Sequence, residues 1–413
     1  MPGWFKGLST EERRVFWACF GGWALDGMDV QIYSFVMPAL IGLWKLSNSE
    51  AGVLGTAALL LSALGGWIAG MLSDRFGRVR VLQVTILWYA SFTFLSGLTH
   101  SFWQLLLVRG LQGLGFGGEW AAGAVLMGEV IAASHRGKAV GVVQGGWAVG
   151  WGAAAIAYTV VFSALPLDWA WRVMFFLGLS PAVLVIYIQR YVNEPQVFEA
   201  TRREVAARNE QVNFFEIFHP ALLATTVLAA LLVTGAMGGY YALTIWLPTY
   251  LKTVHHLSVF NTGAYLAVII VGSAAGYLSA AYLTDGIGRR RTFFLFAIGS
   301  ALIVLLYTSL PVSNGAMLVL GLPLGFFASG IFSGMGPFLT ELFPSRVRGS
   351  GQGFSYNFGR GIGALFPALV GYLSAWMPLG QAIGVFAIIA YAVLILAALR
   401  LPETRGKQLE AYN

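Results

Sequence analysis

The chain contains twelve apolar segments of membrane-spanning length, separated by short polar breaks. A helix needs about 20 mainly apolar residues to cross the hydrocarbon core of a bilayer. Only 10% of the residues are charged, against about 25% in soluble domains, so the chain cannot cover a water-facing surface. We therefore expect an all-α membrane protein with transmembrane helices at about 15–40, 50–72, 80–98, 103–128, 137–162, 171–190, 221–246, 260–284, 292–310, 314–340, 350–374 and 380–400.

The longest polar stretch, residues 191–219, lies at the centre of the chain and separates six apolar segments from six others. This predicts an N-terminal six-helix bundle over 1–190, a cytoplasmic central loop over 191–219 and a C-terminal six-helix bundle over 220–413.

Lys and Arg residues are distributed unevenly between the two ends of the predicted helices. With the N-terminus placed inside, 20 of the 25 basic residues fall on the inner side, which is the bias typical of cytoplasmic loops. Both termini are therefore predicted to be cytoplasmic, and the net charge of +7 requires no nucleic-acid partner. The short loops favour a bacterial inner (plasma) membrane, and we expect a monomer surrounded by membrane lipid.

Two motifs occur once in each half. "GMLSDRFGRVR" (70–80) corresponds to "AYLTDGIGRRR" (281–291) at an offset of 211, and "EVIAASHRG" (129–137) corresponds to "ELFPSRVRG" (341–349) at an offset of 212. Two motifs at nearly the same offset indicate an internal duplication.

At these motifs the chain resembles the major facilitator superfamily, and the resemblance covers essentially the whole chain. Residues 70–78 match the G-x-L-x-D-R-x-G-R signature in full, whereas the second copy has Ala281 and Gly286 in place of its first glycine and first arginine. The resemblance implies two pseudo-symmetric six-helix bundles with a substrate site between them and alternating access by rocking of the halves.

Three narrower resemblances concern the mode of transport. "RGLQGLGFGGEW" (109–120) is similar to a motif of metabolite:proton symporters, and "DGMD" (26–29) to one of aromatic-acid:proton and sialate:proton symporters. "LPETRGKQLE" (401–410) is similar to the tail of sugar porters. Together they imply a carrier that is driven by protons and needs no cofactor.

Five charged residues fall inside the predicted membrane helices: Asp26, Asp29, Arg109, Glu119 and Arg360. A charge at the centre of a bilayer costs roughly 2.5–3.5 kcal/mol on the insertion scale, unless it pairs or faces a wet cavity. Such residues must therefore be stabilised by partners or retained for function.

The acidic residues are candidates for proton coupling. Asp26 and Asp29 are three residues apart and share one helical face, and Arg109 reaches a similar depth, which makes a triad of the three feasible. Either it is a structural ion pair, or burial and the nearby cation poise a carboxylate to titrate. Glu119 lies about 15 Å along the helix from Arg109, so it is either hydrogen-bonded to a neighbouring helix or a second proton-relay carboxylate.

Arg360 is the candidate anion-binding residue. Gln352, Tyr356 and Arg360 follow an i, i+4, i+8 stripe with Asn357 beside it, and an Arg can hold a carboxylate with two parallel hydrogen bonds. The alternative is that Arg360 pairs with an aspartate of the first helix.

Aromatic and amide side chains complete the candidate substrate site. They recur on the fifth helix and in "GGYYALTIWLPTY" of the seventh, where they would either stack on a planar substrate or pack between helices. The candidate substrate-binding residues are Arg109, Gln112, Gln144, Trp147, Tyr240, Tyr241, Gln352, Tyr356, Asn357 and Arg360.

Charged residues of the repeated motifs are candidates for an inner gate, which the resemblance to the superfamily favours. The alternative is that they are solvated charges that set the topology. They are Asp74, Arg78, Glu129, Arg136, Asp285, Arg289, Glu341 and Arg348.

The sequence contains no phosphate-binding P-loop, and its five His and single Cys residues have no metal-ligand spacing, which argues against an ATP-driven pump and a metal site. We expect a proton-coupled symporter of a small organic anion, and we expect that anion to be a carboxylate. The alternatives are a symporter of a neutral sugar or polyol, and a membrane receptor or enzyme on this scaffold.

Overall fold

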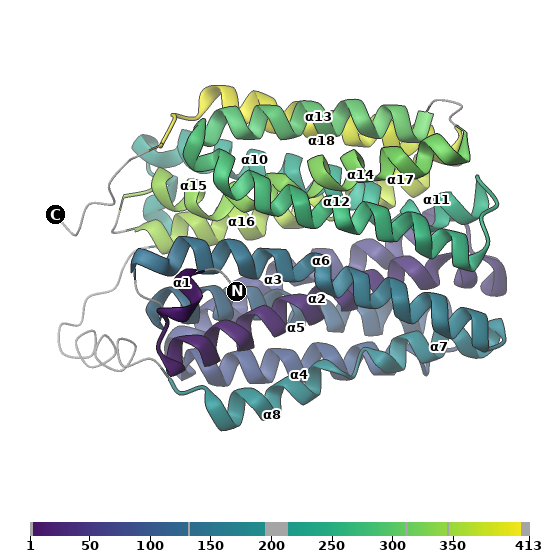
Figure 1. Cartoon of the computed structure of the whole chain (residues 1–413), viewed down its shortest axis with the longest axis horizontal. Coiled ribbons are helices and arrows are strands. Elements are labelled where there is room, and N and C mark those ends of the chain that lie inside the picture. The colour runs from purple at the N-terminus through teal and green to yellow at the C-terminus, as the bar shows by residue number, and fades with distance from the viewer. Residues whose placement is uncertain (1–2, 131–132, 195–213, 310–312, 345–346, 406–413) are drawn as a thin grey trace.

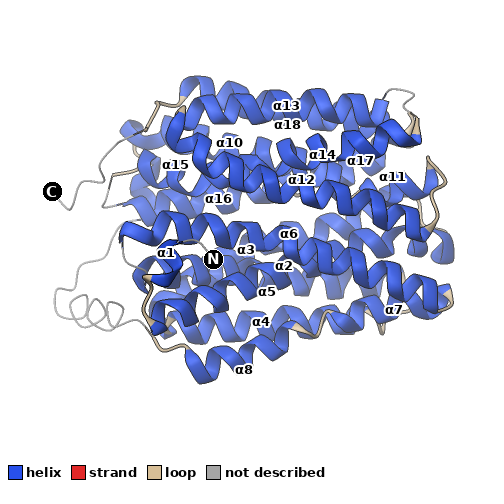
Figure 2. Cartoon of the chain, viewed as in Figure 1, coloured by secondary structure: helices blue, strands red, loops and turns tan. Residues whose placement is uncertain are grey.

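The computed structural model describes residues 3–130, 133–194, 214–309, 313–344 and 347–405, and every regular element within these ranges is a helix (Figure 2). The long helices run lengthwise, with the N-terminal half on one side and the C-terminal half on the other (Figure 1). The first helix and the last described residues lie toward one end of the molecule, which we call the terminal end; the other is the opposite end.

The N-terminal half provides six of the predicted spans. Its last span is divided into two helices, and a single short helix precedes its first. The helices are α1 (Gly3–Lys6), α2 (Thr10–Trp44), α3 (Asn48–Phe76), α4 (Arg78–Ser96), α5 (Phe102–Val130), α6 (Ala133–Ala164), α7 (Leu167–Leu177) and α8 (Pro181–Tyr191).

The C-terminal half provides the other six spans, three of which are divided. Its helices are η1 (Phe214–Phe218), α10 (Pro220–Thr244), α11 (Leu247–Thr253), α12 (Val259–Gly286), α13 (Arg289–Ser309), α14 (Asn314–Gly330), η2 (Ile331–Gly334), α15 (Met335–Leu342), α16 (Arg348–Gly363), α17 (Phe366–Leu373) and α18 (Leu379–Arg400). The predicted all-α architecture is confirmed.

Among the described residues, nine stretches are long and apolar enough to cross a membrane. The described parts of α2, α5 and α16–α17 fall outside that set. These are the helices that carry Asp26, Asp29, Arg109, Glu119 and Arg360, so the polarity of the protein interior is concentrated in three spans.

Proline residues divide several spans that the sequence predicts as continuous. Pro181, Pro248 and Pro367 each occupy the first turn of a helix, in α8, α11 and α17. Proline has no backbone N–H and fits the first turn, where that donor has no partner within the helix. The seventh predicted segment therefore does not end at 246 but continues as α11 to Thr253.

Serine side chains fix where α2 and α3 begin. Ser9 and Ser47 each accept a hydrogen bond from the backbone N–H of the third helical residue, and Glu12 and Glu50 return a hydrogen bond to the serine backbone. This reciprocal capping box satisfies N–H groups that have no partner within the helix.

Glycines allow close packing of helices within each half. A side chain at Gly150 of α6 would collide with the backbone of Ala24 in α2, and one at Gly272 or Gly276 of α12 would collide with the backbone of α14. Small residues permit such approach between membrane helices. By contrast, a Cβ added at Gly145, which has the same spacing in the sequence, would meet no atom of another helix within 4 Å.

Each half has a carboxylate that caps the helix following its copy of the repeated motif. Glu194, after the sixth span, accepts hydrogen bonds from the backbone N–H groups of Arg78, Val79 and Arg80 at the start of α4. Glu403, after the twelfth span, does the same for the first residues of α13. Each cap follows a glycine with positive φ, 108° at Gly77 and 102° at Gly288, a conformation that favours glycine.

The halves contact each other closely at the opposite end. Asn48 Nδ2, at the start of α3, donates to Ser374 Oγ at 3.0 Å, and the Ala368 backbone N–H in α17 donates to Thr56 Oγ1 at 3.2 Å. Because these bonds join residues more than 300 positions apart, they close a seam between the two halves at that end.

Candidate functional site

A small cavity of about 30 Å³ lies between the two halves. Side chains from α2 and α6 form one wall, and side chains from α10, α12, η2 and α16 form the other. The lining residues are Trp23, Gln144, Trp147, Met237, Tyr240, Tyr241, Tyr277, Phe332, Tyr356 and Arg360. The space has room for about one or two water molecules, so a larger ligand could enter only if the cavity widened.

The walls of this cavity are mainly aromatic. Trp23 and Trp147 lie with their ring centroids 5.1 Å apart, and Tyr240 contacts Phe332 at 5.2 Å in an edge-to-face arrangement. The Trp147 indole N–H donates to the Tyr240 hydroxyl at 2.8 Å, which joins the two halves across the cavity. Such walls offer flat apolar surfaces to a planar ligand.

Six of the ten predicted substrate-binding residues line the cavity: Gln144, Trp147, Tyr240, Tyr241, Tyr356 and Arg360. Four lining residues were not predicted from the sequence: Trp23, Met237, Tyr277 and Phe332. Trp23 was detectable, because it lies one helical turn before Asp26 on the same face.

The remaining predicted substrate-binding residues lie elsewhere. Arg109 and Gln112 belong to a hydrogen-bonded network around Asp29. Gln352 accepts a hydrogen bond from Thr340 at 3.0 Å, and Asn357 donates to the backbone of its own helix. These four residues therefore do not line the cavity with Arg360 in this structure, because spacing along a helix does not specify which neighbour each side chain meets.

Arg360 is the basic residue of the cavity wall. Its side chain is 2% exposed, and its guanidinium lies 4.5 Å from the centroid of the Phe116 ring. Its Nε has no hydrogen-bond partner among the described residues. The nearby acid with which it interacts electrostatically is Glu119, rather than either aspartate of α2.

Asp26 and Glu119 form a buried pair of carboxyl groups. Their side chains are 0% and 2% exposed and lie within hydrogen-bonding contact of each other. Gly22 makes the contact feasible, because any larger side chain there would collide with Glu119 Oε1. No well-formed hydrogen bond from another described residue reaches either oxygen of Asp26, whose other close neighbour is the Tyr89 hydroxyl.

Two carboxylates cannot both remain ionised in such a place. Like charges in contact repel each other, and burial penalises each charge further. One proton between the two groups would remove the repulsion and provide the missing hydrogen bond. The arrangement therefore suits a pair that shares a proton.

Asp29 has a different environment, although it lies only one turn from Asp26. Its two oxygens accept hydrogen bonds from Thr93 Oγ1, at 2.5 Å, and from Gln112 Nε2. Arg109 donates to Gln112 Oε1 at 3.1 Å and lies 4.3 Å from the centroid of the Tyr33 ring. Arg109 thus supports Asp29 through Gln112.

The predicted triad of Asp26, Asp29 and Arg109 is therefore divided between two networks. Asp29 belongs with Arg109, whereas Asp26 belongs with Glu119. Both carboxyls face α4 and α5, but they meet different residues there: Thr93 and Gln112 for Asp29, Tyr89 and Glu119 for Asp26.

The predicted gate is described in part. Arg289 forms an ion pair with Glu341 at 3.0 Å, and Thr404 Oγ1 donates to the same carboxylate. Arg78 donates to the Ser73 carbonyl at 2.8 Å. The side chains of the other predicted gate residues lie outside the described part of the chain: Asp74, Glu129, Arg136, Asp285 and Arg348. Within the described residues, no group of three or more His, Cys, Asp or Glu side chains has the arrangement of a metal site.

A model of the Major Facilitator Superfamily matches residues 19–285 and 267–411. The probable 4-methylmuconolactone transporter of Cupriavidus pinatubonensis is 43% identical over 99% of this chain and 95% of its own length. The cis,cis-muconate transport protein of Acinetobacter baylyi is 30% identical, with 92% of each chain covered.

A solved structure agrees with the fold. The crystal structure of a D-xylose-proton symporter superposes with a TM-score of 0.71 at 20% identity, covering 97% of this chain and 100% of the other. At this identity the likeness concerns the arrangement of the helices.

Proposed function

Because the chain belongs to the Major Facilitator Superfamily, a family of carriers rather than enzymes, we propose that it transports a small organic anion, a carboxylate, in symport with protons. The observation that carries the proposal is the buried Arg360 in an aromatic-lined cavity beside the Asp26–Glu119 pair. The relatives named for transport of muconate and a muconolactone support an organic acid as the substrate.

Arg360 is proposed to hold the substrate carboxylate. A buried guanidinium at mid-membrane is costly unless an anion or water accompanies it, and its fork matches the two oxygens of a carboxylate. The rings of Trp147 and Tyr240 would then contact the apolar body of the substrate. A neutral sugar would leave the cation uncompensated, which makes the sugar alternative less favourable.

Protons are proposed to enter through the carboxyl pair. Glu119 interacts electrostatically with Arg360, so a substrate carboxylate that binds Arg360 competes with Glu119 for the same cation. Losing that interaction favours protonation of the pair. Binding of the anion and uptake of a proton would thus promote each other, as symport requires.

The membrane location and the orientation of the protein are also proposed. We place it in the inner membrane of a bacterium as a monomer, with both termini in the cytoplasm, on the basis of the Lys and Arg bias. Cysteines introduced at Thr253 in α11 and at Arg405, in a Cys19→Ser background, should react with impermeant maleimide from outside and from inside, respectively. The reverse pattern would contradict the orientation.

Uptake into proteoliposomes tests the transport proposal. Labelled cis,cis-muconate and nicotinate should accumulate only when the outside is more acidic, and a protonophore should abolish the accumulation. Labelled xylose, a neutral substrate, serves as the comparison. Accumulation of xylose without uptake of either acid would instead favour the sugar alternative.

A further inference from the structure

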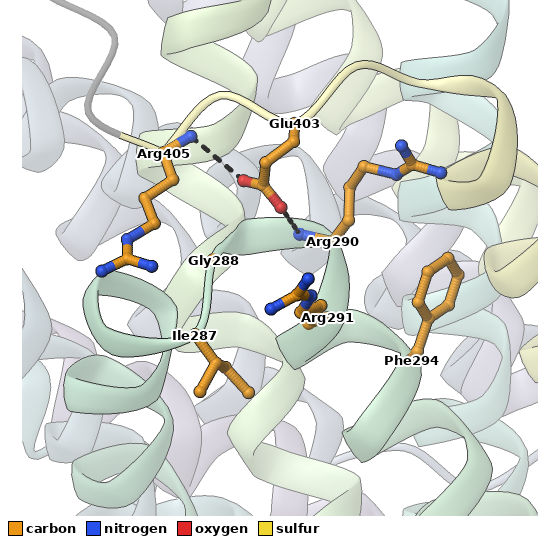
Figure 3. A pocket seen from close by; sticks show the side chains of 7 residues that line it. All are labelled: Ile287, Gly288, Arg290, Arg291, Phe294, Glu403 and Arg405. Atoms are coloured by element: carbon orange, nitrogen blue, oxygen red, sulfur yellow. Dashed lines mark hydrogen bonds between the residues drawn. The ribbon is translucent and has the colours of Figure 1, made fainter.

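A hollow of about 450 Å³ opens at the terminal end of the C-terminal half, remote from the central cavity in the fold. Its walls come from the α12–α13 turn, the first turns of α13 and the segment that follows α18 (Figure 3). The residues that line it are Ile287, Gly288, Arg290, Arg291, Phe294, Glu403 and Arg405. None of them lines the central cavity.

The acid of this hollow is already used by the backbone. Glu403 accepts hydrogen bonds from the N–H groups of Arg289, Arg290, Thr404 and Arg405, at 2.9–3.0 Å. Partial burial opposes ionisation of Glu403, but these four donors outweigh it and hold its pKa below the ordinary value. The carboxylate therefore stays charged, and its oxygens are occupied in capping α13.

The basic side chains carry more charge than Glu403 balances. The Arg290 guanidinium donates to the backbone carbonyls of Ala398 and Leu399, at 2.8 and 2.9 Å. Arg291 and Arg405 are exposed, and their guanidinium groups form no ion pair within the described residues. Figure 3 shows both side chains at the hollow, below Glu403. Two guanidinium groups are thus available to an anion.

The hollow adjoins an apolar surface that faces outward from the protein. Helices α13 and α18 lie along the outer edge of the C-terminal half (Figure 1). Leu295, one turn beyond Arg291, is 44% exposed, and Leu396 and Leu399 on α18 are 64% and 52% exposed. In a membrane protein such side chains face lipid tails, so acyl chains would meet the protein directly beside the hollow.

We propose that this hollow binds the phosphate of an anionic phospholipid in the leaflet at the terminal end. Arg291 and Arg405 hold the phosphate, and the acyl chains lie along Leu295, Leu396 and Leu399. Basic pockets at the membrane surface between helices are suited to anionic headgroups. The adjoining apolar surface favours a lipid over free phosphate, which would use the charges alone.

Binding would have a structural consequence. Arg405 follows Glu403 by two residues, and Glu403 is hydrogen-bonded to the start of α13. A headgroup held by Arg291 and Arg405 would therefore strengthen the connection between α13 and the segment after α18. The inference requires only that the chain is a membrane protein, and it is independent of the transported substrate.

Thermal unfolding of the purified full-length protein in detergent tests the site. Phosphatidylglycerol should raise the melting temperature in a concentration-dependent way, since a ligand that binds the folded state stabilises it. Phosphatidylcholine with the same acyl chains and inorganic phosphate should each have a much smaller effect. The variant Arg291→Gln/Arg405→Gln should require at least about tenfold more phosphatidylglycerol for the same shift.

The control is Arg400→Gln, which removes an exposed basic residue at the same end of α18 but outside the hollow. It should respond to phosphatidylglycerol as the unmodified protein does. The melting temperature without lipid shows whether each variant folds. An equal loss of response in the control and the double variant, or an equal shift with inorganic phosphate, would overturn the lipid site.

Discussion

Asp29 accepts hydrogen bonds from Thr93 and Gln112, whereas Asp26 meets the carboxyl group of Glu119. The sequence placed both aspartates on one face of a helix, and that was enough to mark them as buried charges. It did not show which residues of α4 and α5 each one meets, because the partners of Asp29 lie 64 to 83 residues away in the chain. At this scale sequence identified the chemical groups, and only the packing of α2, α4 and α5 assigned their partners.

Replacing Glu119 with Gln should separate proton coupling from substrate exchange. Gln keeps the size and can hydrogen-bond to Asp26, but it cannot exchange a proton. Accumulation driven by a pH gradient should fall at least about tenfold, while exchange of labelled for unlabelled substrate persists. Asp29→Asn is the comparison: it disturbs the hydrogen bonds of Gln112 and Arg109 and should lower stability, by about 1–3 kcal/mol. Full gradient-driven accumulation by Glu119→Gln would contradict the role of the pair.

Arg360 can be tested for anion binding by two substitutions of graded effect. Lys retains the charge but loses the planar fork, whereas Ala removes both. Substrate affinity should therefore decrease for Arg360→Lys and decrease further for Arg360→Ala. Melting temperature, measured on the same preparations, distinguishes this from a structural ion pair, whose disruption costs about 3–5 kcal/mol. Unchanged affinity with a large loss of stability would identify Arg360 as a structural partner of Glu119.

The helices themselves were largely predictable, and their ends were less so. The twelve apolar segments predicted the membrane-spanning helices, because a bilayer requires continuous apolar helices. The divisions at Pro248 and Pro367 were visible as prolines, but the sequence does not say whether a helix bends or restarts there. The caps by Glu194 and Glu403 were not foreseen, since each carboxylate acts on a helix that begins more than 100 residues earlier.

Removing the Glu403 cap on α13 should lower the folding stability by an amount that depends on pH. Glu403→Ala leaves the first N–H groups of α13 without their acceptor and should cost about 1 kcal/mol or less, because the carboxylate is largely exposed and screened by solvent. The pKa of Glu403 is lowered in the folded protein. Its stabilisation is therefore complete above the ordinary glutamate pKa and is lost as the pH falls through the lowered folded value.

Melting temperatures of the Glu403→Ala variant and the unmodified protein, compared across acidic pH, measure this effect. Their difference should be constant near neutral pH and should decrease at pH values below about 4. Glu216→Ala offers a comparison, since Glu216 lies in η1 and not at the start of α13. A difference that does not depend on pH would mean that the charge of Glu403 does not contribute to the cap.

At the scale of the whole molecule, the two halves meet differently at their two ends. Hydrogen bonds from Asn48 and to Thr56 join α3 to the C-terminal half at the opposite end, and the central cavity is too small for an organic acid. Alternating access requires that this seam opens in another state. The internal repeat in the sequence predicted two halves, but it did not show which end is closed.

The seam depends on Gly52 of α3, and this gives the last prediction. A Cβ at that position would lie 2.6 Å from the carbonyl oxygen of Pro367 and 3.0 Å from Ala368 Cα. Both are backbone atoms, which cannot move aside as a flexible side chain can. Gly52→Leu should therefore destabilise the closed seam while leaving the packing within each half intact. A strain of about 1.4 kcal/mol would shift the equilibrium between closed and open states tenfold.

Labelling of a cysteine in the seam measures that shift. In a Cys19→Ser background, a cysteine introduced by Thr56→Cys should react slowly with an impermeant maleimide, because Thr56 is only 7% exposed. Addition of Gly52→Leu should increase the labelling rate about tenfold, because the open state becomes about tenfold more populated relative to the closed state. It should also slow transport, because the closed state is less populated. Gly42→Leu is the control: Gly42 lies in α2, also toward the opposite end, but a Cβ there would meet no other atom within 4 Å. Because Gly42→Leu adds the same side chain without meeting the other half, equal acceleration by both substitutions would show that the close approach of Gly52 to Pro367 does not hold the seam shut.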